Sequence, residues 1–478
     1  MARRPAVRCA AAVFARIRPV PRCLLAGVVA LALAGGTLAA VTIERHQADE
    51  VGAVGGRVAA PPQAGPADRP TNPVVPRKAP PAEPVAPPCT PDPTLAQPAS
   101  APSPVLAEAF AAFVGHPSVA PHRVSASVWI DGLGEVLAHE PDLALAPASN
   151  EKIFTAMGAL AALGGDTRLT TEIRLTANGE LVVAGGGDAT LTSGGAHSVA
   201  ALADQVRGAG VGHVPGALVV DETRHDGERR ASGWHDWQMP AYTGPLSALM
   251  VDDNRWRADP AFLADPALAN AELLRDALAS RGIAVGGPTV YATAPTPGTV
   301  VASLTSAPVG VLVRDMLQRS DNQIADLLLK EIGYAATGTG SMARGFGATT
   351  MALAPLCIPL EGVADDGSGL SRANERSARE WRVILQAARA RPWWPAFVDG
   401  LPLAARSGTL AGRFHGTAAE ANVRAKTGTI IGGAALSGYG TTAGGRAFAF
   451  SVVVNGPGAE ASAGAIDALV AAVAREDG

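Results

Sequence analysis

The sequence predicts an α/β protein of the α+β sandwich type, in which helices pack on a sheet and a mostly β domain is inserted into the chain. Three observations support this fold class. Alternating apolar residues mark strands near the beginning and the end of a long folded body. Apolar residues from Ile466 to Val473 recur at helical spacing and predict a C-terminal amphipathic helix. The stretch 166–302 is rich in glycine and turn residues around short apolar runs, which is typical of strands.

Both ends of the body contribute strands to the expected sheet. Val124–Ile130 and Glu135–His139 predict a hairpin, and a helix is expected to begin near Ser149. Further runs predict a helix at Val309–Arg319 and strands at Leu181–Ala184, Ala217–Val220, Asn422–Ala425, Ala434–Tyr439 and Ala447–Val454. With 478 residues, the chain is long enough for more than one folding unit. We therefore divide the body into a first part, 105–165, the insertion, 166–302, and a second part, 303–478.

The first 45 residues form a basic leader, in which arginines precede an uncharged run from Cys23 to Ile43. This run has 21 residues, enough to cross a bilayer as a helix. Basic residues stay on the cytoplasmic side of such a segment, so we expect the rest of the chain to be exported. Small residues near Ala39-Ala40 permit cleavage of a signal peptide, whereas the length permits an uncleaved membrane anchor. Both alternatives stay open.

Residues 46–104 are expected to form an extended tether. From about Ala59 onward this segment is dominated by proline and alanine, so it cannot bury enough apolar surface to fold. Beyond the leader the chain has two cysteines, Cys89 in the tether and Cys357 in the body. In an oxidising exterior these two can pair, and two unpaired thiols are the alternative.

The charge and the histidines exclude some classes of function. The chain has a net charge of −4, and the basic leader hides a more acidic body, which argues against nucleic acid as a partner. The nine histidines form no HExxH pattern and do not pair with cysteines at zinc spacing. We therefore expect no metal site and no cofactor.

Ser149 and Lys152 form a candidate nucleophile and base. They lie three residues apart at the predicted start of a helix, so both side chains project from one face. A serine hydroxyl needs a neighbouring base, and a partly buried lysine can be neutral enough to serve. The chain has only four lysines among 39 basic residues, which favours a task for Lys152 that arginine cannot perform. Alone, the pair is also compatible with an ordinary helix cap.

Two further motifs follow downstream. Ser320-Asp321-Asn322 comes between two predicted helices, where short polar side chains can face a cleft or simply cap a helix. Lys426-Thr427-Gly428-Thr429 is expected to end one strand and begin the turn to the next, where an ordinary hairpin turn is the alternative. Together with Ser149 and Lys152, these motifs occur in the order known for class A β-lactamases and penicillin-binding proteins.

From about Val105 to Val473 the chain also resembles a narrower family, the class C low-molecular-mass penicillin-binding proteins. These are D-alanyl-D-alanine carboxypeptidases and endopeptidases with the penicillin-binding-protein/β-lactamase-like serine transpeptidase fold. The matching stretches are Gly185–Leu191, Gly233-Trp234, Gly244–Leu249 with Asn254, Asp366–Arg372 and Ser407–Leu410. The family carries inserted domains between its first two motifs, and the insertion expected here is short for this family.

The resemblance implies roles for the motif residues. Ser149 would attack the carbonyl between two D-alanines of a peptidoglycan stem peptide, and Lys152 would accept its proton. Ser320 would relay a proton to the leaving group, Asn322 would bind the peptide, and Lys426 would supply a positive charge. Thr427, Gly428 and Thr429 would hold the terminal carboxylate. The backbone N–H groups of Ser149 and Thr429 would form the oxyanion hole. β-Lactam antibiotics would form long-lived adducts. The protein would act on the extracytoplasmic face of the bacterial membrane or in the cell wall.

The resemblance is incomplete where substrate choice is concerned. The family often binds a diaminopimelate end with an arginine, aromatic residues and an acid. Arg372 and Tyr242 match, but the acid matches only if Asp236 is accepted out of register. Two other functions remain as alternatives, a β-lactamase and a non-catalytic β-lactam sensor or scaffold. No glutamate is followed four residues later by asparagine, as the class A lactamase loop requires. Whether carboxypeptidase or endopeptidase action dominates stays open.

Overall fold

The computed structural model of the chain describes residues 95, 99–239, 241–254 and 264–477. These residues belong to one compact unit, Ala82–Gly478. The predicted leader, its uncharged run and Cys89 lie outside the described residues. In the part that is described, no helix is long and apolar enough to cross a bilayer.

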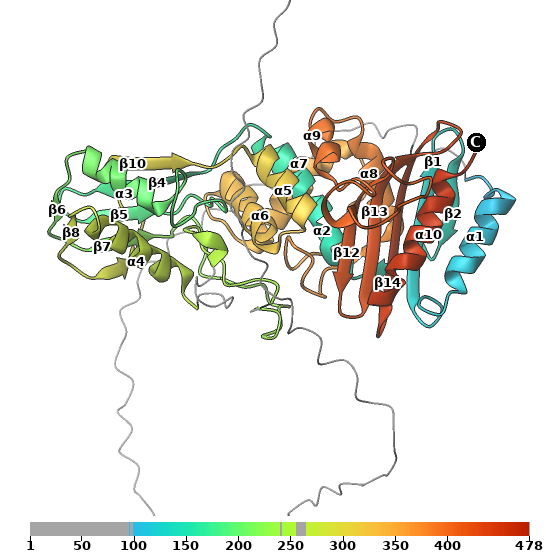
Figure 1. Cartoon of the computed structure of the whole chain (residues 1–478), viewed down its shortest axis with the longest axis horizontal. Helices are drawn as coiled ribbons and strands as arrows, with labels where there is room; N and C mark the ends of the chain where they lie inside the picture. The colour runs from blue at the N-terminus through green and yellow to red at the C-terminus, as the bar shows by residue number, and fades with distance from the viewer. Residues whose placement is uncertain (1–94, 96–98, 240, 255–263, 478) are drawn as a thin grey trace, which may run out of the picture. The chain divides into compact units, whose positions relative to one another are not determined.

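A five-stranded antiparallel sheet lies between α10 and α8, on the right in Figure 1, with the strand order β12-β13-β14-β1-β2. Its strands are β1 (Arg123–Ile130), β2 (Gly134–His139), β12 (Arg424–Ile430), β13 (Gly433–Thr441) and β14 (Ala447–Asn455). The register of β1 on β14 runs from Arg123 opposite Asn455 to Ile130 opposite Phe448. The structure therefore confirms that the two ends of the body build one sheet.

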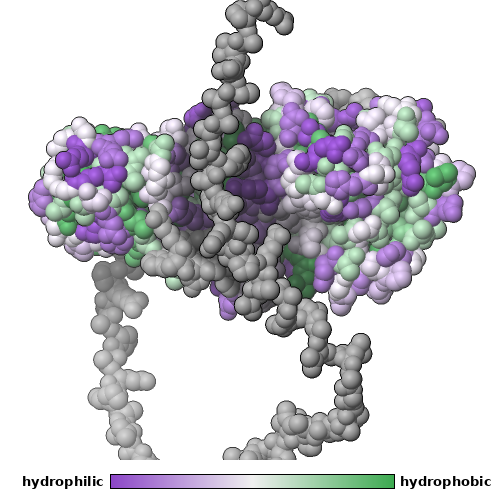
Figure 2. All heavy atoms as spheres, viewed as in Figure 1, coloured by the Kyte–Doolittle hydropathy of each residue, from purple (hydrophilic) through white to green (hydrophobic). Residues whose placement is uncertain are grey.

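Helices cover both faces of this sheet, because its strands are apolar on both sides. Along β14, Phe450 and Val452 join the core under α1 (Pro104–Val114) and α10 (Ala463–Ala474). Ala449 and Val453, which alternate with them, join the core formed by helices of the opposite face. Those helices are α2 (Glu151–Gly158), α5 (Val309–Arg319), α6 (Asn322–Thr337), α7 (Met342–Leu353), α8 (Ala378–Ala388) and α9 (Trp394–Gly400). Hydrophilic and apolar residues are interspersed on the outer face drawn in Figure 2, as is usual for a protein surface.

The insertion has a second five-stranded sheet with the order β10-β4-β5-β7-β9. Its strands are β4 (Thr170–Leu175), β5 (Leu181–Ala184), β7 (Leu218–Asp221), β9 (Thr289–Tyr291) and β10 (Thr299–Thr305). Because β5, β7 and β9 are parallel, they need crossover connections. The helices α3 (Val199–Gly208) and α4 (Pro266–Ala279) lie in these connections. The insertion thus contains two helices that the sequence analysis did not predict, and its last strand extends to Thr305, beyond the expected boundary at 302.

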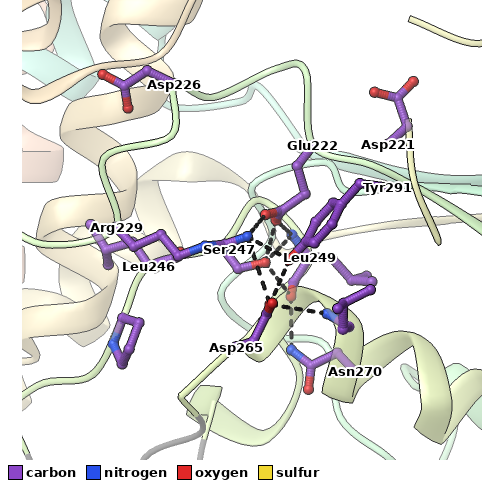
Figure 3. A network of polar contacts seen from close by, with 12 residues as sticks. Asp221, Glu222, Asp226, Arg229, Leu246, Ser247, Leu249, Asp265, Asn270 and Tyr291 are labelled. Carbon is purple, nitrogen blue, oxygen red and sulfur yellow. Dashed lines mark hydrogen bonds and ion pairs between the residues drawn. The ribbon is translucent and has the colours of Figure 1, made fainter. Parts of the chain in front are cut away.

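Short elements complete the fold. Two two-stranded sheets pair β3 (Ala144–Leu145) with β11 (Arg376–Ser377) and β6 (His213–Val214) with β8 (Ala284–Val285). Where β7 ends, a polar network ties the insertion together (Figure 3): Glu222 forms an ion pair with Arg229 at 2.7 Å, and Tyr291 donates a hydrogen bond to Asp265 at 2.5 Å. This network holds the base of the segment that follows Glu222 along the chain.

The predicted motif Lys426–Thr429 lies within β12 rather than at its end. The sequence predicts a strand that stops at Ala425, but β12 pairs with β13 as far as Ile430 opposite Gly433. Gly428 belongs to the strand because of what faces it: a Cβ atom there would lie 2.6 Å from the carbonyl oxygen of Pro147. A bare backbone at Gly428 lets the strand approach the turn that carries Ser149.

Candidate active site

Ser149 lies in a 3-10 turn, Ala148–Asn150, directly before α2. The preceding residue, Ala148, has φ +49°, in the left-handed region that is strained for a residue with a Cβ atom. The side chain of Ser149 is partly accessible, whereas Lys152 on the first turn of α2 is completely buried. The Nζ atom of Lys152 lies 3.2 Å from the Oγ atom of Ser149. The expected nucleophile and base are therefore within hydrogen-bond reach.

Lys152 has three hydrogen-bond partners of two kinds. Its Nζ atom lies 2.6 Å from the Oδ1 atom of Asn322 and 2.5 Å from the carbonyl oxygen of Ser368, both of which can only accept. The third partner, the Ser149 hydroxyl, can donate as well. A neutral amine has two N–H donors and one lone pair, so it matches two acceptors and one hydroxyl donor. The geometry suits a lysine that accepts the proton of Ser149.

The pKa of Lys152 also supports its role as a neutral base. Burial lowers the pKa of Lys152 to about 8, while the carboxylates of Asp326, Asp366 and two further acids oppose this shift. A lysine with a pKa near 8 has a sizeable neutral fraction close to neutral pH. This is the range in which a general base works best.

Ser320 and Lys426 form a second serine–lysine pair. Ser320 ends α5 with φ 58° and ψ 41°, and Asp321 caps α6 by accepting a hydrogen bond from the backbone N–H of Ile324 at 3.0 Å. Lys426, fully buried on β12, donates a hydrogen bond to the Oγ atom of Ser320 at 2.9 Å. Burial and the positive charges of Lys152 and Arg413 hold the pKa of Lys426 well below its usual range. The free site thus disfavours the charge that the sequence analysis expected on Lys426.

One cavity brings the motif residues together. It has a volume of about 280 Å³ and is lined by Ser149, Ser320, Thr409, Arg413, Thr427 and Thr429. A helix start, a helix–helix junction and a strand therefore face the same space. Within the described residues, no group of three or more His, Cys, Asp or Glu side chains is placed to hold a metal ion.

Comparison with protein families gives one match that spans most of the body. The model of the D-Ala-D-Ala carboxypeptidase 3 (S13) family matches residues 128–261 and 261–476. The chain belongs to this family. It is accordingly a serine-type D-Ala-D-Ala carboxypeptidase of the low-molecular-mass penicillin-binding protein type, as the sequence predicted.

Relatives of this member of the S13 family include a D-alanyl-D-alanine carboxypeptidase from Actinomadura sp. (strain R39). It is 32% identical over 421 residues, which cover 70% of this chain and 78% of that protein. Carboxypeptidase DacB from Mycolicibacterium smegmatis is 32% identical over 347 residues, which cover 68% and 74% of the two chains. Among solved structures, penicillin binding protein 4 (dacB) from Haemophilus influenzae matches with a TM-score of 0.64 at 23% identity, over 70% of this chain and 90% of that one. This last match supports the fold.

A second cavity adjoins the S13 catalytic centre. It has a volume of about 260 Å³ and is lined by Ala241, Tyr242, Asp253 and the run Ser320–Gln323. Tyr242 is 53% exposed, and its ring makes an edge contact with Trp237 at 6.1 Å between centroids. The carbonyl oxygen of Tyr242 accepts a hydrogen bond of 2.9 Å from the Nδ2 atom of Asn322. Tyr242 therefore lines this second cavity, and its role in binding substrate stays a prediction.

Arg372 and Asp236 are not brought into either cavity. The guanidinium of Arg372 is exposed and donates a hydrogen bond to the carbonyl oxygen of Ile431, in the turn between β12 and β13. The Asp236 side chain is 94% exposed and forms an ion pair with Arg230 at 3.0 Å. Of the three residues expected at a diaminopimelate end, only Tyr242 thus lines a cavity, so a substrate role for Arg372 stays a prediction.

Two residues of the cavity were not predicted as site residues. Thr409 accepts a hydrogen bond of 2.8 Å from the hydroxyl of Thr427, and it belongs to the stretch Ser407–Leu410 that resembles the family. Arg413 contacts Asp467 of α10, with its Nε atom 2.9 Å from the carboxylate. The family-like stretch was a usable signal for Thr409. For Arg413 the local sequence offers none, because its partner is far away in the chain.

Proposed function

We propose that the protein cleaves the terminal D-alanyl-D-alanine bond of peptidoglycan stem peptides through an acyl-enzyme on Ser149. The observation that carries this proposal is the arrangement of Lys152, with two acceptor oxygens and the Ser149 hydroxyl around its Nζ atom. It supports a neutral amine that activates the serine. The family membership supplies the substrate class.

Acylation begins when the lone pair of Lys152 takes the hydroxyl proton of Ser149. The Oγ atom then forms a bond to the carbonyl carbon of the penultimate D-alanine, and the oxygen of that carbonyl becomes an oxyanion. The backbone N–H groups of Ser149 and Thr429 stabilise this charge. Both residues line the cavity, which supports the assignment.

The leaving amine of the last D-alanine needs a proton. Ser320 relays to it the proton that Lys152 took from Ser149, which leaves Lys152 neutral again. The 2.9 Å contact with the amine of Lys426 supports this step because it holds the Ser320 hydroxyl at the cavity. The carbon–nitrogen bond breaks, D-alanine departs, and water hydrolyses the ester on Ser149 to release the shortened peptide. Asn322 has one further N–H that can contact the peptide backbone.

The terminal carboxylate of the substrate lies between Thr427, Thr429 and Arg413. A carboxylate bound there supplies the negative charge that Lys426 lacks in the free site, so binding of substrate raises the pKa of Lys426 and favours its cationic form. In this way Lys426 contributes charge when the carboxylate is present. Gly428 contributes by keeping β12 close to the Ser149 turn.

β-Lactams acylate Ser149 by the same steps, because their ring amide takes the place of the scissile bond. We further propose that the body acts outside the cytoplasmic membrane, connected to the leader by the 46–104 tether. The basic leader and its 21-residue uncharged run support export. The membrane is a partner only if that run remains uncleaved.

The test is incubation of the purified protein with a cell-wall pentapeptide and with a cross-linked peptide dimer, followed by mass analysis. We expect steady release of D-alanine from the pentapeptide, and none with Ser149→Ala. Cleavage of the dimer would add endopeptidase action. A protein that is acylated by penicillin but releases no D-alanine would contradict the proposal and favour a sensor. Rapid turnover of penicillin would favour a β-lactamase.

A further inference from the structure

The two acceptor oxygens of Lys152 come from segments outside its own helix. One is the side-chain oxygen of Asn322 at the start of α6, and the other is the backbone carbonyl of Ser368 in the loop between α7 and α8. An amine works as a base only if its lone pair points at the serine, so both acceptors must be held in place. The structure places one carboxylate, Asp366, behind the loop of the first acceptor, and it connects that loop through Trp234 to the segment that contacts the second.

Asp366 is fully buried and closes the loop that carries Ser368. Its two carboxylate oxygens accept hydrogen bonds from the backbone N–H groups of Gly369 at 2.6 Å and Ser371 at 2.7 Å, and from the amide of Asn374 at 2.7 Å. Gly369 has φ +80°, and a Cβ atom there would lie 1.8 Å from the carbonyl oxygen of Ala148. The loop is therefore wrapped tightly around Asp366 and pressed against the serine turn.

The fourth hydrogen bond of Asp366 comes from the insertion. The indole N–H of Trp234 donates to its Oδ2 atom at 2.7 Å. Nearby, the amide of Gln238 donates to the carbonyl oxygen of Leu370 at 3.1 Å, and the backbone N–H of Gly233 donates to Asp365 at 2.8 Å. The side chain of Trp234 packs with residues of both segments, among them Leu370. The segment 231–242 is thus attached to the Ser368 loop at several points.

The same segment holds the other acceptor. Within the insertion, Arg229 and Leu246 close the base of this segment (Figure 3). The backbone N–H of Leu246 donates to the carbonyl oxygen of Arg229 at 2.8 Å, and the guanidinium of Arg229 donates to the carbonyl oxygen of Leu246 at 2.9 Å. Near its end, the carbonyl of Tyr242 accepts from the Nδ2 atom of Asn322. A carbonyl can only accept, so it fixes which end of the Asn322 amide faces Lys152.

We infer that Asp366 and Trp234 are positioning residues of the acylation step, which together hold the Ser368 carbonyl and the Asn322 amide oxygen against Lys152. Asp366 acts on the first acceptor through its loop, and Trp234 connects that loop to the segment that orients the second. Neither residue lines the two cavities. The inference rests on the proposed role of Lys152 as the base.

The test is Trp234→Phe, with Trp129→Phe as the matched control. Both tryptophans are buried, at 3% and 2% exposure, but the indole N–H of Trp129 has no hydrogen-bond partner among the residues that the structure describes. The readout is the acylation rate constant and the preceding binding constant for a fluorescent penicillin, measured on variants with unchanged circular dichroism. We expect Trp234→Phe to lower the acylation rate constant roughly ten- to a hundredfold, the scale of a small misplacement of a reacting group. Binding, and both constants of Trp129→Phe, should stay unchanged. Equal acylation by the two variants would overturn the inference.

The pH dependence of acylation by Asp366→Asn distinguishes a positioning role of Asp366 from a purely structural one. The groups that face Lys152 are the carboxylates of Asp326, Asp366, Asp321 and Glu151, which raise its pKa, and the amine of Lys426, whose cationic form the free site disfavours. Removing the charge of Asp366 lowers the pKa of Lys152, so the rise of the acylation rate with pH should move to lower pH. In Trp234→Phe the charge is unchanged, and the rate should fall without that shift. An unshifted profile in folded Asp366→Asn would contradict the placement of Asp366 beside the base.

If Lys152→Arg still acylates normally, the proposed function of Lys152 fails while the loop network stands. The two failures are therefore distinguishable by experiment.

Discussion

Arg413 at the cavity is held by Asp467 of the C-terminal helix, which accepts hydrogen bonds from both its Nε and Nη2 atoms. This bidentate contact fixes the plane of the guanidinium while Arg413 also lines the space beside Thr427 and Thr429. The C-terminal helix therefore determines the direction of a positive charge in the substrate cavity.

Arg413→Gln should weaken the recognition of peptides that end in a free carboxylate. Hydrogen bonds to charged groups contribute about 1.5–3 kcal/mol, so kcat/KM for a pentapeptide should fall by roughly ten- to a hundredfold. The same peptide with an amidated C-terminus is the control, because it lacks the charge that Arg413 would bind. An equal loss on both peptides would show that Arg413 does not distinguish the carboxylate.

Ser149→Ala should abolish covalent labelling by a fluorescent penicillin. In the described site, Ser149 is the serine with Lys152 at 3.2 Å, and alanine removes the attacking oxygen. The measurement is gel fluorescence after incubation, with thermal unfolding to check the fold. Ser320→Ala serves as a comparison and should retain the label with slower kinetics. Stoichiometric labelling of folded Ser149→Ala would place the nucleophile elsewhere.

Lys152→Arg should lose acylation by about a hundredfold or more, because a guanidinium cannot give up its proton near neutral pH. In the unchanged protein only neutral Lys152 accepts the serine proton. Its pKa is lowered to about 8, so the acylation rate should rise with pH and level off above that value. Stopped-flow acylation across this range checks both statements. A rate that does not depend on pH around 8 would exclude Lys152 as the titrating base.

Lys426→Ala should lose roughly 2–4 kcal/mol of transition-state stabilisation, comparable to the loss of an oxyanion donor. Lys426→Arg keeps a charge and should retain part of the activity, in contrast to Lys152→Arg. Acylation rates of folded variants test this difference. If Lys426→Arg and Lys426→Ala are equally inactive, Lys426 does not act through its charge. Its low pKa in the free site then indicates that it exchanges a proton with Ser320.

Cys357 should pair with Cys89 in the exported protein. Cys357 is disulfide-bonded in the structure, and Cys89 lies outside the described residues, so the pairing remains a prediction. Intact mass after alkylation, with and without reductant, tests it. Cys89→Ala should leave Cys357 open to alkylation. Alkylation of both Cys89 and Cys357 without reductant in the parent protein, located by peptide mapping, would refute the pairing.

The sequence predicted those parts of the site whose residues are close together in the chain. Ser149 and Lys152 were recognisable because helical spacing puts them on one face, and α5 begins and ends where the pattern predicted. Arg413 was not recognisable, because its position depends on an aspartate in another element. The position of Asp366 was not recognisable either, because its four hydrogen-bond donors come from its own loop and from Trp234, which is far away in the chain.

Two errors of the fold prediction have local causes. Gly428 and its threonine neighbours resemble a turn by composition, but the contact with the Ser149 turn requires glycine inside a strand. In the insertion, the helices α3 and α4 begin at side-chain caps, Ser198 and Asp265. These caps were present in the sequence. Gly194 and Gly195 masked the cap at Ser198, because they suggested a turn. The cap at Asp265 was overlooked although its stretch contains no glycine.

The pairing of β1 with β14 has a consequence for the order in which the molecule can fold. Arg123 and Asn455 are opposite each other in the sheet although most of the body separates them in the chain. Such distant contacts form late and slowly. For a chain that leaves the cytoplasm from its N-terminal end, Ser149 emerges long before β14 does. Under the proposed export from the N-terminal end, the nucleophile therefore gains its surroundings only after nearly the whole polypeptide has been translocated, so that an activated serine arises on the outer side of the membrane.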